Sequence, residues 1–158
     1  MSKILVSYFS CTGYTKKLGE LINTKVGGDL YEIIPKNKYS EEDLDWTNPD
    51  SRCSREMMDL SSRPELNEIK DVSSYDTIFV GYPIWWGKAP TIINTFLESI
   101  DLKGKTIIPY ATYHSSGIGE SDKYLIPSCE GSNYIKAKGF SMTFTEDEVS
   151  KWLNTIIG

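Results

Sequence analysis

Histidine and cysteine are scarce in this chain of 158 residues. The single histidine, His114, leaves little material for a metal site or for a Ser-His-Asp triad. The three cysteines, Cys11, Cys53 and Cys129, are widely spaced and form no CxxC pair. They therefore indicate neither a disulfide framework nor a zinc site, and they are typical of a reducing compartment.

Basic residues are in the minority, and the sequence has no long apolar run. Lys and Arg number 17 against 22 Asp and Glu, which gives a formal net charge of −5. This balance disfavours a nucleic-acid partner and favours partner proteins with a basic surface. The apolar runs are too short to cross a bilayer, and the run at 3–9 is too short for a signal-peptide core. We expect one cytoplasmic domain over residues 1–158, with no membrane segment.

Short runs rich in β-branched and aromatic residues alternate with segments of helical periodicity. The predicted strands are residues 4–9, 30–34, 77–82, 106–110 and 138–144. Apolar residues with helical spacing lie at 18–22, 93–100 and 149–157, and Thr145 with Glu148 forms a capping box before the last segment. This alternation predicts an α/β fold of three layers, in which helical crossovers join parallel strands.

Two segments, 36–74 and 115–132, are less regular. Each is expected to hold one short helix, near 54–60 and 121–126 respectively. In an open parallel sheet, ligands bind at the carboxyl ends of the strands, near the switch in strand order. The loops after the first, third and fourth predicted strands are therefore the candidate site.

The first of these loops is Ser10-Cys11-Thr12-Gly13-Tyr14-Thr15. Unpaired N–H groups at a helix N-terminus favour a phosphate, although Ser and Thr are also ordinary helix caps. The loop lacks the pattern GxxxxGK[ST], so it is not the P-loop of a nucleoside triphosphatase. Cys11 with Lys17 resembles a tyrosine phosphatase loop, but a lysine does not supply the required guanidinium fork. Cys11 remains a candidate for a reactive thiol.

The other two loops are aromatic and glycine-rich. Residues 81–87 read Gly-Tyr-Pro-Ile-Trp-Trp-Gly. Because neighbouring side chains diverge, at least one of the two tryptophans is expected to be partly exposed, where it could stack on a planar heterocycle. The alternative is that both pack at the rim of the core. The loop at 111–119 offers hydroxyls, backbone groups and His114, which is either a ligand contact or a hydrogen-bonded loop histidine.

These loops resemble the flavin-binding loops of the flavodoxin family, along essentially the whole chain. The first loop is similar to the pattern Ser/Thr-x-Thr-Gly-x-Thr. Residues 81–87 resemble the signature of a short-chain bacterial flavodoxin-like branch, as do residues 43–46, 48–49 and 63–64. The resemblance implies a flavodoxin-like three-layer sandwich with a five-stranded parallel sheet of order 2-1-3-4-5, and FMN as the cofactor.

The resemblance also implies which residues contact FMN. The first loop would hold the phosphate, the second would flank the isoalloxazine ring, and the third would contact its pyrimidine side. The implied residues are Ser10, Cys11, Thr12, Gly13, Tyr14 and Thr15; Pro83, Ile84, Trp85, Trp86 and Gly87; and Thr112, Tyr113, His114, Ser115 and Gly117. Relatives often have Ser-Gly where this chain has Tyr113-His114, so these bulkier residues are expected to shield the flavin, alter its potential or partly obstruct the pocket.

Three functions are compatible with these features. The first is a low-potential electron carrier that docks on basic redox partners, and the second is an FMN-dependent NAD(P)H oxidoreductase acting on quinones or nitro or azo compounds. The third, a phosphoacceptor receiver domain, is disfavoured because the acidic residues that it needs after the first and third strands are missing. Trp46 either covers the flavin from the long crossover or packs in the core, and packing is the favoured interpretation.

Overall fold

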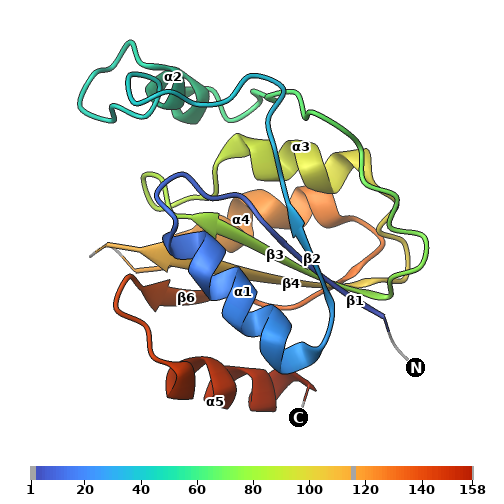
Figure 1. The fold of residues 1–158 in the computed structure, drawn as a ribbon. Coiled ribbons are helices and arrows are strands. Elements are labelled where there is room, and N and C mark those ends of the chain that lie inside the picture. Colours follow the sequence, from blue (N-terminus) through green and yellow to red (C-terminus); the bar gives the residue numbers. More distant parts are fainter. Residues whose placement is uncertain (1–2, 115–116, 158) are drawn as a thin grey trace.

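The computed structural model describes residues 3–114 and 117–157, in which helices cover both faces of a parallel sheet (Figure 1). The strands are β1 (Ile4–Tyr8), β2 (Asp29–Glu32), β3 (Thr77–Pro83), β4 (Thr106–Tyr113), β5 (Asn133–Tyr134) and β6 (Lys138–Ser141). The helices are α1 (Tyr14–Val26), α2 (Arg52–Met58), α3 (Thr91–Ser99), α4 (Ser121–Leu125) and α5 (Glu146–Ile157), with a 3₁₀ turn, η1 (Ile126–Cys129), after α4. The predicted helices and strands are thus confirmed, with shifts of a few residues at their ends.

The strand order across the sheet is β2-β1-β3-β4-β5, which confirms the predicted order 2-1-3-4-5. The fifth position differs from the prediction, because two short strands, β5 and β6, both pair in parallel with β4. Between them, the backbone N–H of Ala137 donates to the Asp122 carboxylate (2.9 Å) instead of to β4. This hydrogen bond explains why the edge strand is interrupted.

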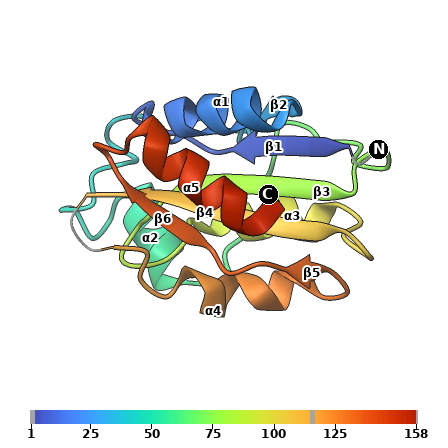
Figure 2. The ribbon, with the colours of Figure 1, turned by 90° about the horizontal axis from the view of Figure 1, so that it is seen from below.

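The two faces of the sheet carry separate cores. Helices α1 and α5 cover one face, and α3 and α4 cover the other (Figures 1 and 2). Alternate residues of the central strands supply each side, so Leu5 and Ile78 pack toward α3, whereas Val6 and Phe79 pack toward α1 and α5. Each large apolar side chain buried in this way contributes about 1.5–3 kcal/mol of stability.

Neighbouring side chains cap the first turns of α5 and α2. The N–H of Glu148 donates to Thr145 Oγ1 (3.2 Å) at the start of α5, so the predicted capping interaction is present. Ser51 Oγ accepts from the N–H of Ser54 (3.3 Å) at the start of α2. Helix α2 therefore begins at Arg52, two residues before the predicted segment.

The long crossover between β2 and β3 places α2 beyond the carboxyl ends of the strands, at the upper left of Figure 1. The loops after β1, β3 and β4 lie at this same end of the sheet. No helix in the described ranges is long and apolar enough to cross a membrane. The crossover and the three loops together surround the candidate site.

Candidate functional site

Buried hydrogen bonds hold the loops after β1, β3 and β4 together. Thr15 Oγ1 and Thr112 Oγ1 lie 2.8 Å apart, and both side chains are buried. The N–H of Ile84 donates to the carbonyl of Thr112 (2.9 Å), which joins the second loop to the third. Because a buried hydroxyl without a partner is costly, the Thr15–Thr112 hydrogen bond fixes the spacing of the first and third loops.

The first loop presents unpartnered backbone donors at the start of α1. Gly13 has φ 93°, a conformation that favours glycine, and Ser10 Oγ accepts from the N–H of Gly13 (3.1 Å). In the described part of the chain, the N–H groups of Thr12, Tyr14 and Thr15 donate to no protein acceptor. Three free donors at the positive end of a helix dipole fit a phosphate group.

The second loop is a tight hairpin turn, Trp85-Trp86-Gly87-Lys88. Two backbone hydrogen bonds join Trp85 and Lys88 (2.9 and 3.0 Å). Trp86 has φ 50° and Gly87 has φ 73°, so the turn is of type I′, which a tryptophan rarely adopts. Trp86 is 48% exposed, whereas Trp85 packs against the rings of Phe9 and Tyr39. The prediction that one tryptophan is exposed is therefore confirmed.

The third loop supports the tip of this turn. The Gly87 carbonyl accepts from the N–H of Glu120 (2.7 Å). Gly119, with φ 62°, packs so closely that an added Cβ would lie 2.6 Å from Gly87 Cα. Tyr113 is partly buried and His114 is exposed. Ser115 lies outside the described residues.

A cavity of about 540 Å³ opens between the loops and the crossover. Its lining falls into two groups of residues. The first, which we call the strand-end wall, consists of Cys11, Thr12, Pro83, Ile84, Trp85, Trp86 and His114. The second, which we call the crossover wall, consists of Leu44, Trp46 and Cys53. Met142, which follows β6, completes the lining.

All residues of the strand-end wall were predicted from the sequence as site residues. Of the other predicted residues, Ser10, Gly13, Tyr14 and Thr15 lie at or just before the start of α1, Thr112 and Tyr113 end β4, and Gly87 and Gly117 lie in the second and third loops. Sequence reasoning missed Leu44, Cys53 and Met142. It also misjudged Trp46, because this side chain is 71% exposed and lines the cavity instead of packing in the core. The exposed position arises because the crossover passes outside the sheet.

A charged network attaches the crossover to the strand-end wall. The guanidinium of Arg52 lies 3.7 Å from the centroid of the Tyr39 ring, and its Nε donates to Glu56 Oε2 (3.0 Å). The Tyr39 hydroxyl donates to Glu56 Oε1 (2.5 Å), and burial together with this hydrogen bond raises the pKa of Tyr39. The Tyr39 ring contacts Trp85 edge-to-face, with centroids 5.7 Å apart. Through Tyr39 and Trp85, these contacts connect α2 to the lining of the cavity.

Cys11 lies where the two walls meet. Burial raises the pKa of its thiol to about 12, with smaller contributions from Cys53 and Glu56. A thiol of this kind is almost fully protonated at neutral pH, so the structure does not support the expectation that Cys11 is a reactive nucleophile.

Comparison with known proteins defines the class to which this arrangement belongs. The sequence model of the flavodoxin family matches residues 3–156. The chain therefore belongs to the flavodoxin family, and its fold is flavodoxin-like. A search of curated proteins found no match.

Three solved structures give more detail. A candidate flavoprotein from Bacteroides uniformis is 44% identical, with a TM-score of 0.92 over 97% of this chain and 98% of that one. A candidate flavoprotein from Bacteroides eggerthii is also 44% identical, with a TM-score of 0.91 over 100% and 99% of the two chains. A flavoprotein from Lactobacillus acidophilus, solved in complex with FMN, is 25% identical, with a TM-score of 0.72 over 96% and 99%. FMN is thus the cofactor that this family membership indicates.

Proposed function

We propose that this protein binds FMN in the 540 Å³ cavity and acts as a low-potential electron carrier between redox partners. The proposal rests on one observation: backbone N–H groups without a protein acceptor and a cavity lined by aromatic side chains lie at the same end of the sheet. The Lactobacillus acidophilus flavoprotein, which matches nearly the whole of this chain, was solved in complex with FMN. This similarity supports the choice of cofactor.

The residues around the cavity have chemistry that fits the two ends of FMN. The N–H groups of Thr12, Tyr14 and Thr15 would hold the phosphate, because they point out of the α1 turn without a protein acceptor. The indoles of Trp46 and Trp86 would provide flat apolar surface for the ring. When bound, FMN would supply the redox chemistry, and the protein would orient it and tune its potential.

The hairpin turn offers one backbone group to the flavin. The Gly87 carbonyl is held by the N–H of Glu120, so it is not free to turn toward the cavity. The Trp86 carbonyl accepts no hydrogen bond from the described residues. With FMN bound, the Trp86 carbonyl would be the group of this turn that is free to accept a hydrogen bond from an N–H of the flavin ring.

Acidic residues beside the cavity favour a low potential and a basic partner. The segment 39–51 contains five carboxylates and no Lys or Arg. Four of these carboxylates are exposed around Trp46: Glu41, Glu42, Asp45 and Asp50. Negative charge disfavours an anionic reduced cofactor, although salt screens the more distant groups. The same charges attract a redox partner with a basic face.

Two measurements test this proposal. Titration of the cofactor-free protein with FMN should quench flavin fluorescence at a ratio of one to one, and reduction of the complex with dithionite should proceed in two one-electron stages. A protein that fails to quench FMN would contradict the assignment of the cavity. Fast oxidation of NAD(P)H with a quinone by the loaded protein would instead favour the oxidoreductase function.

A further inference from the structure

Tyrosine hydroxyls donate hydrogen bonds to carboxylates at four places in the described part of the chain. The pairs are Tyr31 with Glu68, Tyr39 with Glu56, Tyr75 with Asp29, and Tyr134 with Asp122. A phenol in such a pair has a proton acceptor within hydrogen-bonding reach. It can therefore release its proton in the same step in which it loses an electron, provided that a second redox-active ring lies against it.

Tyr39 is the member of this set whose ring contacts a tryptophan. The ring of Tyr39 meets that of Trp85 edge-to-face, with centroids 5.7 Å apart. Among the described residues, no indole lies against the rings of Tyr31, Tyr75 or Tyr134. Electrons pass rapidly between rings in contact, because the tunnelling distance is short. Trp85 also lines the cofactor cavity, so it connects Tyr39 to that space.

The proton acceptor of Tyr39 is held from two sides. The Tyr39 hydroxyl donates to Glu56 Oε1 (2.5 Å), and Arg52 Nε donates to Glu56 Oε2 (3.0 Å). The guanidinium of Arg52 also lies over the Tyr39 ring, 3.7 Å from its centroid. Hydrogen bonds to an ionised acceptor are short and strong. Each oxygen of the Glu56 carboxylate thus has a fixed partner, and Oε1 is the one that faces the phenol.

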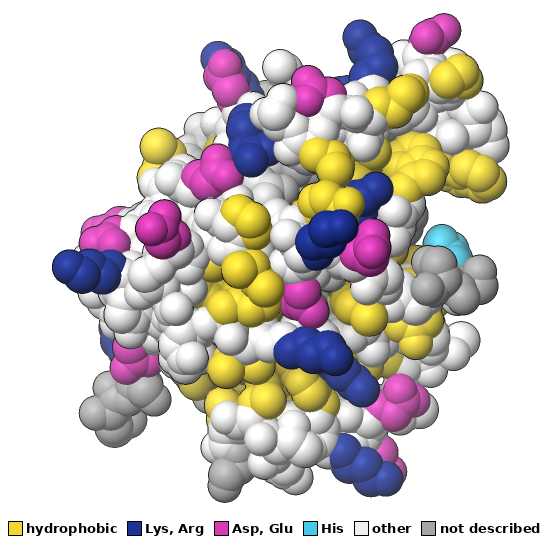
Figure 3. Space-filling view, turned by 180° about the vertical axis from the view of Figure 1, so that it is seen from behind, with side chains coloured by type: hydrophobic (Ala, Val, Ile, Leu, Met, Phe, Trp, Pro, Cys, Tyr) yellow, Lys and Arg dark blue, Asp and Glu magenta, His cyan; other side chains and the backbone are white. Residues whose placement is uncertain are grey.

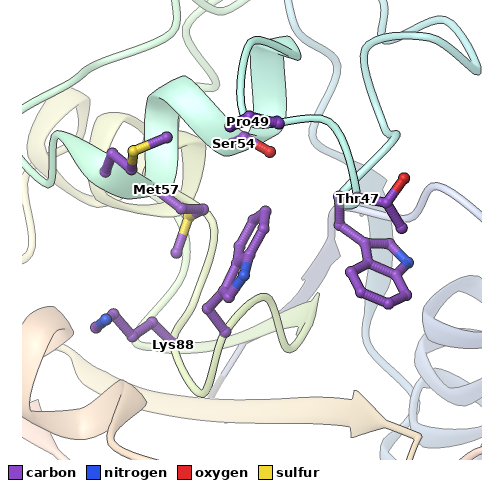
Figure 4. A pocket seen from close by; sticks show the side chains of 8 residues that line it. Thr47, Pro49, Ser54, Met57 and Lys88 are labelled. Carbon is purple, nitrogen blue, oxygen red and sulfur yellow. The ribbon is translucent and has the colours of Figure 1, made fainter.

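Helix α2 divides its side chains between two spaces. Met57, with Lys88 of the hairpin turn, lines a second cavity of about 370 Å³ (Figure 4). Glu56 is not part of that lining, and its side chain is only 13% exposed. The acceptor for the Tyr39 proton is therefore largely buried, although it belongs to a helix at the surface of the molecule.

The tryptophan end of this series of contacts is open to small molecules. Trp85 shares the lining of the cofactor cavity with Trp46 and Trp86, which are 71% and 48% exposed. Figure 3 shows hydrophobic side chains on the surface above the single histidine, His114, which lines the same cavity. Tyr39 is not part of this lining. A small oxidant in the cavity therefore meets Trp85 before it meets Tyr39.

We propose that Trp85, Tyr39 and Glu56 form a proton-coupled electron relay. A small one-electron oxidant in the cavity, of the class of inorganic radicals, takes an electron from the Trp85 indole and becomes an anion, which leaves an indole radical cation. Tyr39 returns an electron to this indole, and its phenolic proton passes to Glu56 Oε1. The products are an intact indole, a neutral tyrosyl radical and a protonated Glu56 carboxyl, so charge and protons balance.

The relay goes beyond the proposed electron carrier, because no step of it requires a flavin. It transfers an oxidising equivalent from the wall of the cavity to Tyr39. The indole at the cavity is thereby restored, and the radical is moved to a residue outside the lining.

Pulse radiolysis with the azide radical, which oxidises tryptophan, tests the relay in the FMN-free protein. Trp46→Phe/Trp86→Phe is the parent variant, because of the four tryptophans it leaves Trp85 in the cavity lining and the buried Trp152. The absorption of the tryptophan radical should decay as that of the tyrosyl radical grows, at a rate independent of protein concentration. Deuterium oxide should slow this step, because a proton moves with the electron.

Three further substitutions in this parent distinguish the relay from ordinary packing. Tyr39→Phe keeps a ring against Trp85 but should abolish the growth of the tyrosyl signal. Glu56→Gln keeps a hydrogen-bond acceptor for the phenol but removes the proton acceptor, so it should slow the transfer at least about tenfold. Tyr134→Phe is the matched control, since Tyr134 has a carboxylate partner but no indole contact, and it should leave the rate unchanged.

Several outcomes would overturn the proposal. These are a tyrosyl signal that still grows in Tyr39→Phe, an unchanged rate in Glu56→Gln, and an equal loss in Tyr134→Phe. Equal rates in water and deuterium oxide would also overturn it, and that comparison requires no change within the relay. Because the protein is measured without FMN, failure to bind FMN would contradict the proposed function and leave the result for the relay as it stands.

Discussion

The two walls of the cofactor cavity are built differently. The strand-end wall follows directly from three central strands, and buried hydrogen bonds such as Thr15–Thr112 hold its loops together. The crossover wall comes from a long segment with one short helix, and it is attached through an ion pair and a hydrogen bond among Arg52, Glu56 and Tyr39. Trp46 of this wall is mostly exposed, whereas Trp85 of the other packs against the rings of Phe9 and Tyr39.

This difference suggests separate roles for the two walls. Most residues of the segment 41–50 are exposed, so this part of the crossover wall can move at lower cost than the buried strand-end wall. The strand-end wall would therefore set where FMN binds, and the crossover wall would regulate what else reaches it. Substitutions in the two walls should separate these roles.

The largest expected effect is on the thiol at the junction of the walls. Because its pKa is raised to about 12, Cys11 should react with iodoacetamide about a thousandfold more slowly at pH 8 in the folded protein than in urea. The rate in the folded protein should keep rising up to about pH 12, whereas the unfolded thiol is largely ionised above about pH 10. Peptide mapping by mass spectrometry would measure the alkylation rate at Cys11. Equal rates in both states would show that the walls do not bury this thiol.

The same shift has a consequence for stability. The folded thiol binds its proton more tightly than the unfolded one, so the unfolded state releases that proton first as the pH rises. The contribution of Cys11 to the free energy of unfolding should therefore fall between about pH 9 and pH 12. Cys11→Ser should remove this part of the pH dependence.

The next largest effect is expected at the support of the hairpin turn. Gly119→Ala should lower the free energy of unfolding by about 2–4 kcal/mol, because the position has positive φ and contacts the Gly87 backbone. Gly104→Ala is the matched control, since Gly104 also has positive φ but no neighbour within 4 Å of an added Cβ. It should cost about 1 kcal/mol. Urea unfolding measures both, and equal losses would contradict the close glycine contact.

A smaller effect is expected at the hydroxyl pair. Thr15→Val should cost about 1–3 kcal/mol, because Thr112 Oγ1 then loses its partner while still buried. The double variant Thr15→Val/Thr112→Val should be more stable than the sum of the single changes predicts. A double-mutant cycle in urea tests this coupling, and strict additivity would argue against the hydrogen bond.

The smallest effect on stability is expected in the crossover wall. Trp46→Ala should change the free energy of unfolding by no more than about 0.5 kcal/mol, because the side chain is exposed. It should nevertheless weaken FMN binding about three- to tenfold through the loss of one aromatic contact. Fluorescence titration with FMN measures the second effect. A large loss of stability with unchanged affinity would restore the core-packing interpretation of Trp46.

The sequence predicted the strand-end wall well because its signals are local. Alternating strands and helices predict where parallel strands end, and the adjacent tryptophans predict one exposed ring. The crossover wall carries no comparable signal. The exposure of Trp46 depends on the path of a segment of nearly forty residues (36–74), which is set by distant contacts such as Tyr39 with Trp85.

The split edge strand illustrates the same limit. The apolar pattern at 138–144 predicts one strand, but the interruption before it depends on Asp122, a residue of α4 that accepts hydrogen bonds from Tyr134 and Ala137. Likewise, Cys53 and Glu56 of α2 add to the rise in the pKa of Cys11, which burial dominates. Such contacts between distant segments leave no periodicity in the sequence.

Binding of one FMN molecule between the three loops is best tested by a crystal structure of the protein with FMN. The phosphate should lie within hydrogen-bonding distance of the N–H groups of Thr12, Tyr14 and Thr15, with the ring in the cavity lined by Trp86 and His114. A phosphate bound away from the start of α1, or a ring outside this cavity, would contradict it.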